Sequence, residues 1–369
     1  MLIDDDGKII DIVPIIEFEP STIKKYNGAL VPGFINAHCH LELSHLKNKF
    51  PEKTGLPEFL MQVTKQRNAV QEEINNAINE AEIEMINNGI VAVGDISNNE
   101  NTFFQKSKQN LYYHTFIELF GFNPANANTS FEGGVELFKI AKAKGISASL
   151  VPHATYSISG KLIELITDHC FENKTPTSIH MLESNDENEF YMQGTGLYRK
   201  LYRELGADIN HFIPTGKTAL ESLLPYFNNK VTTLMVHNTI ATELDIQWAE
   251  QLHSNLFWCF CPNANLFIED RIPDIPQLMK SMHHITIGTD SLASNHQLSV
   301  LEELKTIQYK FPEIKTDALF KWATLNGAKF LGIEDRFGSL EVRKSPGINL
   351  INNMTNGDSL LNASVRRIF

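Results

Sequence analysis

The most regular feature of the chain is a series of short apolar runs that alternate with longer amphipathic stretches. The runs are rich in Val, Ile, Leu and Phe without regular polar alternation, which is typical of strands buried on both faces of a parallel sheet. The stretches between them have helical periodicity, and the longest spans about residues 57–88, with Gly89 just beyond its end. Eight strands are predicted, at residues 30–40, 90–97, 111–120, 146–155, 177–184, 231–238, 256–263 and 285–291.

Strands that alternate with helices predict a parallel (β/α)8 barrel, here over residues 31–333. The alternative is an open, doubly wound sheet, but the chain has neither of the glycine-rich phosphate-binding loops that would support it. The two ends differ from the barrel pattern, because residues 7–13 and 338–342 are short alternating segments bounded by turn residues. These segments predict strands of a small β domain formed by residues 1–30 together with 334–369.

Composition narrows the class of protein and its partners. With 32 Lys and Arg against 44 Asp and Glu, the formal net charge of −12 argues against binding to a nucleic acid backbone. No apolar run approaches the roughly 18 residues of a membrane span, and the N-terminus lacks the features of a signal peptide. The four cysteines are too few and too irregularly spaced for a disulfide framework. We therefore expect a reduced, cytoplasmic protein, whose partners are a small-molecule substrate and, in a homodimer, a second copy of the chain.

The carboxyl ends of the predicted strands carry an unusual set of side chains. Catalytic groups of a barrel lie at these ends, because the loops that follow the strands form the active site. Histidines and carboxylates are found there at seven positions, namely His38, His40, His153, His180, Glu183, His237 and Asp290.

Four of these residues form a candidate metal site. His38 and His40 are two residues apart on a strand, so both side chains point to the same face and can bind one ion. With His180 and Asp290 they provide three imidazoles and a carboxylate, a set that suits one divalent ion, Zn2+ or Fe2+. Such an ion lowers the pKa of a bound water toward about 7. Structural zinc sites favour cysteine ligands, which this set lacks.

Three residues are expected to move protons. His237 and Asp290 are placed to orient the water and to accept its proton. Glu183, three residues after His180, is placed to carry a proton to the substrate and then to the leaving group.

Two further residues have two interpretations each. His153, at the end of the fourth strand, either contacts the substrate or packs behind the site. Glu42 continues the spacing of the histidine pair, being two residues after His40, and either contacts the substrate or lies in a solvated loop.

Several motifs resemble those of the amidohydrolase superfamily. The segment PGFINAHCH at residues 32–40 resembles the family's first-strand signature, and segments 180–183, 236–238 and 288–291 resemble its later metal and proton-transfer motifs. The H-x-x-E form at 180–183 resembles the deaminase and chlorohydrolase branch, which acts on amino-substituted nitrogen heterocycles and includes guanine and aminodeoxyfutalosine deaminases. The resemblance spans nearly the whole chain.

Further segments are similar to the nucleoside-type members of that branch. VPHATY at 151–156 resembles a motif whose histidine contacts the substrate, and CPNANL at 261–266 and DSLASN at 290–295 also resemble this branch, which implies substrate binding by His153 and Asn295. Binuclear members carry a bridging lysine at the end of strand four. No lysine lies between residues 146 and 155, so the resemblance implies one metal ion. Residues 185–230 are expected to form extra helices over the site.

These observations predict a metal-dependent hydrolase that deaminates a purine-like, pyrimidine-like or nucleoside-like ring with metal-activated water. One alternative is a hydrolase that uses the same site to cleave an amide or displace a halide. The other is a non-catalytic small-molecule binding protein that has kept the barrel, although binding alone does not require the proton-transferring residues.

Overall fold

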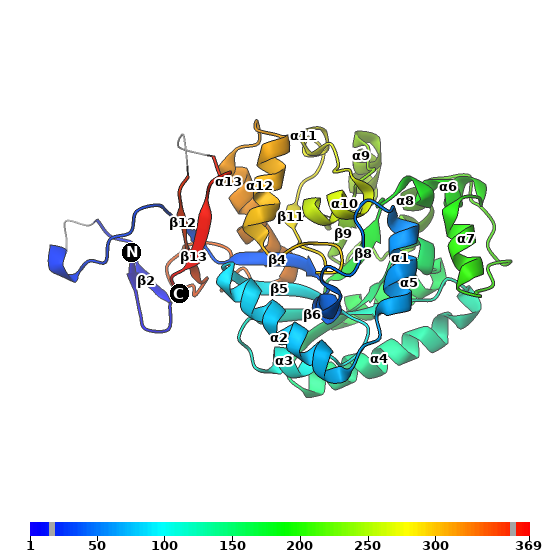
Figure 1. Cartoon of the computed structure of the whole chain (residues 1–369), viewed down its shortest axis with the longest axis horizontal. Helices are drawn as coiled ribbons and strands as arrows, with labels where there is room; N and C mark the ends of the chain where they lie inside the picture. Colours follow the sequence, from blue (N-terminus) through cyan, green and yellow to red (C-terminus); the bar gives the residue numbers. More distant parts are fainter. Residues whose placement is uncertain (15–18, 355–358) are drawn as a thin grey trace.

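The computed structural model describes residues 1–14, 19–354 and 359–369, and a barrel of eight parallel strands lies at its centre (Figure 1). The strands are paired in two groups of four, in the orders β4-β5-β6-β7 and β8-β9-β10-β11. Single backbone bridges, Cys39 with Asp290 and Ala154 with His180, join the groups and close the barrel. The predicted (β/α)8 barrel is confirmed. The strands are β4 (Phe34–Cys39), β5 (Ile90–Ser97), β6 (Tyr112–Leu119), β7 (Ser147–Pro152), β8 (Thr177–Met181), β9 (Thr233–His237), β10 (Leu256–Phe260) and β11 (Ile285–Ile287).

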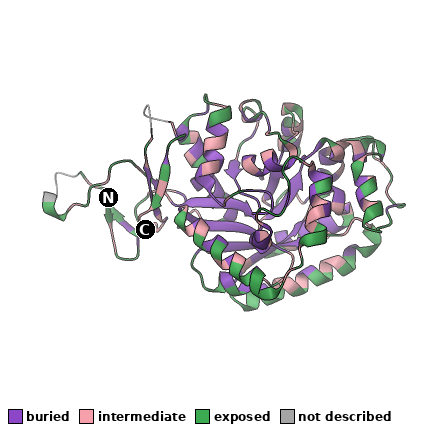
Figure 2. Cartoon of the chain, in the orientation of Figure 1, coloured by how far each residue is buried: buried purple, intermediate pink, exposed green. Residues whose placement is uncertain are grey.

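Helices surround the barrel, and their outer faces are exposed while the strands are buried on both faces (Figure 2). In α2, the buried residues Ile74, Ile78, Ala81 and Met85 recur every three or four positions and form one apolar face. The helices are α1 (Leu56–Gln66), α2 (Gln71–Asn87), α3 (Phe103–Ser107), α4 (Ala127–Ala143), α5 (Gly160–Asn173), α6 (Asn185–Gln193), α7 (Leu197–Glu204), α8 (Ala219–Leu223), α9 (Glu243–Leu252), α10 (Pro262–Glu269), α11 (Ile275–Leu278), α12 (Val300–Lys310), α13 (Thr316–Lys321) and α14 (Gly327–Leu331).

Two predicted elements are each divided in the structure. The predicted helix at 57–88 is two helices, α1 and α2, because the chain leaves helical geometry between them and Val70 is extended. The predicted strand at 30–40 is also two strands, β3 (Ala29–Pro32) and β4, which belong to different sheets. Gly33 separates them.

Strands from both ends of the chain form small sheets beside the barrel, as predicted. β3, β12 (Ile348–Asn352) and β13 (Ser364–Arg367) form a three-stranded antiparallel sheet, and β1 (Leu2–Ile3) pairs with β2 (Ile9–Asp11). Both termini lie at one end of the long axis of the molecule, and α6 and α7 lie at the other (Figure 1). The predicted domain boundary at residues 30 and 31 falls inside β3, and the division into domains stays a prediction.

The prediction of a strand at residues 338–342 is wrong. Gly338 and Arg343 both have a positive φ, of 86° and 78°, which turns the chain at both ends of this segment. Val342 is 44% exposed. The alternation of apolar residues there reflects turns and not a strand.

The described residues include no helix with both the length and the apolar content that crossing a membrane requires. All four cysteines are buried and free, as expected from their number and spacing.

Gly33 is a position where the close approach of the small sheet to the barrel leaves no room for a side chain. A Cβ atom there would lie 2.3 Å from Val91 Cγ1 and 2.9 Å from the Pro346 carbonyl oxygen. We expect Gly33→Ala to lower the free energy of unfolding by about 1–3 kcal/mol, because neither a β-branched side chain nor a backbone carbonyl moves easily. Gly133→Ala is the matched control, since Gly133 is exposed within α4 and faces open space; it should stabilise the protein slightly. Denaturant unfolding measures both, and equal stability of the two variants would contradict the prediction.

Candidate active site

The predicted site residues meet where the two halves of the barrel join. The backbone N–H of His180 donates to the His153 carbonyl at 3.0 Å, and the N–H of Asp290 donates to the His38 carbonyl at 3.1 Å. Asn36 strengthens the second junction, because its side chain donates to Thr289 Oγ1 at 2.7 Å and accepts from the Thr289 N–H at 3.0 Å. The backbone bonds that close the barrel therefore also place the imidazoles.

Four side-chain atoms converge at this end of the barrel. The Nε2 atoms of His38 and His40 are 3.1 Å apart, and each is 3.2 Å from Nε2 of His180. Asp290 Oδ1 lies 3.5 Å from Nε2 of His38 and 3.3 Å from that of His40. Tetrahedral zinc with bonds of about 2.0–2.1 Å requires ligand atoms about 3.3 Å apart. The spacing of the four atoms fits a single ion of this size.

The protonation of the ring nitrogens also fits a cation. Nδ1 of His180 lies 2.6 Å from the His153 carbonyl oxygen, so it carries the proton and leaves a lone pair on Nε2. Burial lowers the pKa of His40 to about 3 and that of His180 well below its ordinary value, so both rings are neutral at pH 7. Burial alone would raise the pKa of Asp290, but its hydrogen bond with His38 and the nearby imidazoles hold it well below its usual range. Neutral nitrogen lone pairs and a carboxylate that face one another are a donor set that suits a divalent cation.

Left-handed backbone conformations position three residues around these atoms. Leu182, His237 and Asp290 have φ values of 53°, 73° and 56°, a region that residues other than glycine rarely adopt. Each follows or ends a barrel strand, at the end of the barrel where the ligand atoms lie. Strain of this kind persists where the surrounding structure enforces it, commonly at functional sites.

Glu183 lies next to the four ligand atoms. It is 5% exposed, and its Oε1 is 3.6 Å from Nε2 of His237. Burial, followed by the negative charges of Glu187 and Asp290, raises the pKa of Glu183 well above its ordinary value. Burial therefore favours the protonated form of this carboxyl group.

His237 and Asp290 are each held by a buried neighbour. Nδ1 of His237 is 2.8 Å from Asn265 Oδ1, which places the ring proton on Nδ1 and the lone pair on Nε2, toward Glu183. Burial lowers the pKa of His237 to about 4. Ser294 Oγ donates to Asp290 Oδ2, which leaves Oδ1 to face the imidazoles.

The three predicted substrate-binding residues have different positions. His153 lines the cavity above the ligand atoms, and its Nδ1 is 2.6 Å from Ser157 Oγ. Glu42 and Asn295 do not belong to the described lining of this cavity. Glu42 accepts from Arg67 and from the Asn98 N–H, and Asn295 donates to the Thr289 carbonyl and to Glu303. Glu42 and Asn295 therefore lie behind the cavity wall, where their hydrogen bonds hold these neighbouring groups in place.

A polar group on the cavity wall was not predicted from the sequence, and it is formed by Arg67, Asn98 and Glu118. Arg67 Nη2 donates to Asn98 Oδ1 at 3.1 Å, and Asn98 Nδ2 donates to Glu118 Oε2 at 2.8 Å. Burial raises the pKa of Glu118 to about 8. A signal was available for Glu118, which lies at the end of the third strand, where the strand-end rule applies. No comparable signal marks Arg67, which follows α1.

The cavity above the ligand atoms has a volume of about 600 Å3, within the range of small-molecule sites. Residues 185–230 form α6, α7 and α8, as expected, and the segment after α7 forms part of the cavity wall. The upper wall is mainly apolar and includes Phe59, Val63, Phe120, Phe122, Leu201 and Ile209. Polar groups are gathered at its floor, namely His40, His153, His180, Glu183, His237 and Asp290.

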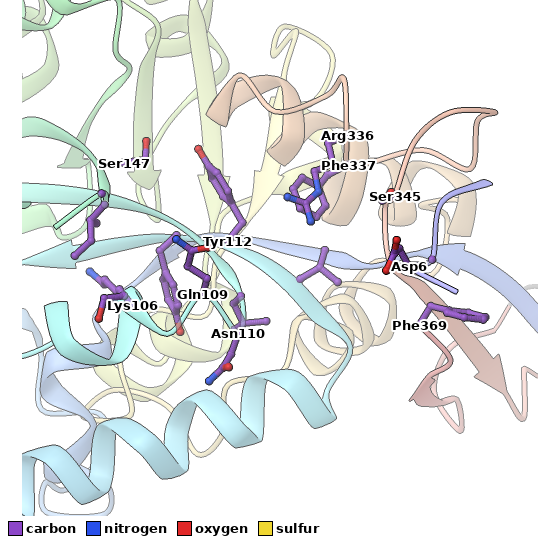
Figure 3. A pocket seen from close by; sticks show the side chains of 18 of the residues that line it. Asp6, Lys106, Gln109, Asn110, Tyr112, Ser147, Arg336, Phe337, Ser345 and Phe369 are labelled. Carbon is purple, nitrogen blue, oxygen red and sulfur yellow. The ribbon is translucent and has the colours of Figure 1, made fainter. Parts of the chain in front are cut away.

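A second cavity, of about 580 Å3, lies at the opposite end of the barrel, between the strand starts and the terminal segments (Figure 3). Tyr112 and Ser147 begin β6 and β7, and Arg336 and Phe337 lie across from them. It contains none of the predicted site residues.

Three imidazoles and a carboxylate at the carboxyl ends of barrel strands, with an acid beside them in a cavity, define a metal-dependent hydrolase. Comparison with known proteins agrees, because the model of the amidohydrolase family matches residues 29–364. The chain therefore belongs to the amidohydrolase family. The predicted family and enzyme class are confirmed.

Two curated relatives match nearly the whole chain. An adenosine deaminase from Helicobacter pylori is 27% identical over 366 residues, which cover 95% of this chain and 87% of that protein. An aminodeoxyfutalosine deaminase from Nitratiruptor is 28% identical over 361 residues, which cover 93% of this chain and 85% of that protein.

Solved structures share the fold at lower identity. A crystal structure of Helicobacter pylori aminofutalosine deaminase in complex with methylthio-coformycin has a TM-score of 0.84 at 23% identity, covering 100% of this chain and 94% of that one. A zinc complex of atrazine chlorohydrolase from Arthrobacter aurescens has a TM-score of 0.71 at 14% identity, and the match covers 92% of this chain and 81% of that one.

The geometry of the four ligand atoms predicts the metal content of the protein. Protein purified without added metal should contain about one divalent ion per chain. A second group of possible ligands, Glu118, His153 and His180, shares His180 with the four-ligand set, and Nδ1 of that ring already bonds the His153 carbonyl. His38→Ala should lose the ion while retaining the circular dichroism of the folded protein. His283→Ala is the matched control, since its side chain is 70% exposed and distant from the site, and it should retain the ion. Elemental analysis measures all three, and two ions per chain in repeated preparations would show that the site is not mononuclear.

Proposed function

We propose that this protein catalyses the hydrolytic deamination of an amino-substituted purine-like or pyrimidine-like ring, with a sugar attached as in nucleosides. The observation that carries the proposal is the buried carboxyl group of Glu183, 3.6 Å from Nε2 of His237 and beside the four ligand atoms, in a cavity of about 600 Å3. Deaminases among the relatives that match most of the chain support the same reaction.

The proposal includes one ion, Zn2+ or Fe2+, held by His38, His40, His180 and Asp290. When bound, the ion acts as a Lewis acid that makes water nucleophilic at neutral pH. Both metals accept this ligand set, so their availability in the cell decides between them. The four free, buried cysteines support a location in the reducing cytoplasm. The homodimer stays a prediction.

Glu183 acts as the general acid in the first half of the reaction. Its protonated carboxyl donates to the ring nitrogen beside the carbon that carries the amino group, which makes this carbon electrophilic. Hydrolysis of an amide does not require protonation of a ring nitrogen, so an acid in this position favours a heterocyclic substrate.

His237 and Asp290 act on the attacking water. The lone pair on His237 Nε2 accepts a proton from the water as its oxygen bonds to the ring carbon. The ionised carboxylate of Asp290 stabilises the positive charge that develops on this imidazole. Glu183, deprotonated by the first step, takes the proton of the new hydroxyl group and gives it to the amino group, and the carbon–nitrogen bond breaks to release ammonia. The proton held by His237 then returns to Glu183, 3.6 Å away, which restores both groups.

Apolar side chains make up much of the cavity wall, and hydrogen bonds and charges act more strongly beside such a surface than in bulk water. His153, above the ligand atoms, is placed to hydrogen-bond a hydroxyl or an exocyclic group of the substrate.

Substitution of Glu183 tests its role directly. We expect Glu183→Gln to retain the fold and the metal ion but to lose turnover by at least ~100-fold, because general acid–base groups contribute about 10²–10⁴. His38→Ala should instead lose both metal and turnover. Near-normal turnover of Glu183→Gln would mean that another residue transfers the proton.

Ammonia release from a panel of compounds tests the substrate class. The panel contains adenine, guanine and cytosine, their nucleosides and 5′-modified adenosines, together with N-acyl amino acids, cyclic amides and chloro-substituted heterocycles. We expect ammonia from amino heterocycles, with the nucleosides preferred over the free bases because the cavity is larger than a base. Activity confined to the amides, or chloride release without deamination, would overturn the proposal. Loss of the signal in Glu183→Gln excludes a contaminating deaminase.

A further inference from the structure

A buried ion pair lies behind the segment that carries His40. Lys106 Nζ is 2.6 Å from Asp95 Oδ2, and both side chains are fully buried. Asp95 belongs to β5, the second barrel strand, and Lys106 to α3, the helix that follows it. Neither residue belongs to the described lining of the active-site cavity. The pair is therefore outside the reaction that we propose.

Surrounding groups hold Lys106 in one position. Its Nζ donates to Ser97 Oγ at 2.9 Å and to Thr115 Oγ1 at 3.0 Å, in addition to its contact with Asp95. The aromatic rings of Phe103 and Tyr113 lie beside it, with centroids 6.0 Å and 5.7 Å from Nζ. Two hydrogen bonds and the ion pair with Asp95 thus hold the ammonium group.

The other oxygen of Asp95 is bonded to the chain next to His40. Asp95 Oδ1 accepts the backbone N–H of Leu41 at 2.8 Å, at the start of the helical turn η3 (Leu41–Leu46). Asp95 is also the sheet partner of Cys39. The residues on both sides of His40 are therefore attached to Asp95.

The position of His40 requires such attachment. The residue lies at the point where the chain leaves β4 and turns into η3, with φ −121° and ψ 78°. Its Nε2 is within 3.3 Å of Nε2 of His38, of Nε2 of His180 and of Asp290 Oδ1. Functional sites tolerate displacements of only about 0.5 Å, so a free backbone at Leu41 would loosen this ligand.

Stability alone does not account for the pair. A buried ion pair contributes little net stability, and apolar residues of similar size often replace it without loss. We propose that Asp95, neutralised and held by Lys106, is a positioning residue for His40, and that its hydrogen bond to the Leu41 amide aims the His40 imidazole at the other ligand atoms. This inference rests on the metal-binding part of the proposed function and not on the substrate.

The experiment compares two double variants, each of which removes both charges. Asp95→Asn with Lys106→Met keeps an amide oxygen that accepts from Leu41, whereas Asp95→Leu with Lys106→Met has no acceptor. Tyr113→Phe is the matched control, because it removes a buried hydrogen bond of 3.0 Å to Glu82 on the same side of the barrel and leaves Asp95 intact. Each protein is loaded with Zn2+, and the rate at which a chelator removes the metal is measured, together with circular dichroism and melting of the metal-free protein.

The Leu/Met variant should lose zinc at least ~10-fold faster than the unmodified protein, an effect of the size seen when groups that orient metal ligands are removed. The release rates of the Asn/Met variant and of Tyr113→Phe should stay within about threefold of the unmodified rate. A folded Leu/Met variant with the unmodified release rate would overturn the inference. Equally faster zinc release from both double variants would also overturn the inference. The loss of the two charges, and not the loss of the hydrogen bond to Leu41, would then account for the effect. Failure of the unmodified protein to bind zinc would instead refute the proposed metal site.

A second measurement requires no substitution, in case the Leu/Met variant does not fold. If anchoring of Leu41 favours metal binding, metal binding must favour the anchored state by the same factor. Hydrogen exchange of the Leu41 amide should therefore slow at least ~10-fold on addition of Zn2+. Unchanged exchange would overturn the inference, and exchange at Tyr113, in the interior of β6, is the internal reference.

Discussion

Closure of the barrel is the constraint on which the site depends. The two four-stranded halves meet through backbone bonds at His38 with Asp290 and at His153 with His180. The same backbone bonds that complete the sheet therefore bring ligand atoms from distant parts of the chain within 3.1–3.5 Å of one another. A change that loosens either junction would displace ligand atoms directly, so stability and function are linked at this end of the barrel.

Burial then determines the charge state of each group. Two carboxyl groups in one cavity have opposite pKa shifts: burial and then negative neighbours raise the pKa of Glu183, whereas the hydrogen bond with His38 and the nearby imidazoles outweigh burial at Asp290 and lower its pKa. One is therefore an acid and the other an anion at the same pH, as a proton-transfer reaction requires. Burial keeps His40 and His180 neutral and able to bind a cation. The site thus combines a cation-binding group of ligands with a proton donor.

The four candidate metal ligands could be predicted from the sequence, because the ends of barrel strands follow a simple rule. Side chains at i and i+2 share a face and the carboxyl ends of parallel strands meet, so His38, His40, His180 and Asp290 were predictable without coordinates. The rule fails beyond the strand. Glu42 lies in the turn after β4, where alternation no longer determines direction, and it points to Arg67 and Asn98 behind the cavity wall.

Periodicity and motif spacing by themselves determined the barrel, its eight strands, the terminal sheet and the residues at its catalytic end, because these follow from local geometry and from the burial of apolar faces. Only the tertiary structure decided which polar groups line the cavity, where Glu118 and Arg67 replaced the expected Glu42 and Asn295. It also decided the turns at Gly338 and Arg343 and the attachment of Leu41 to Asp95. These features depend on contacts between segments far apart in the chain, which no pattern of neighbouring residues records.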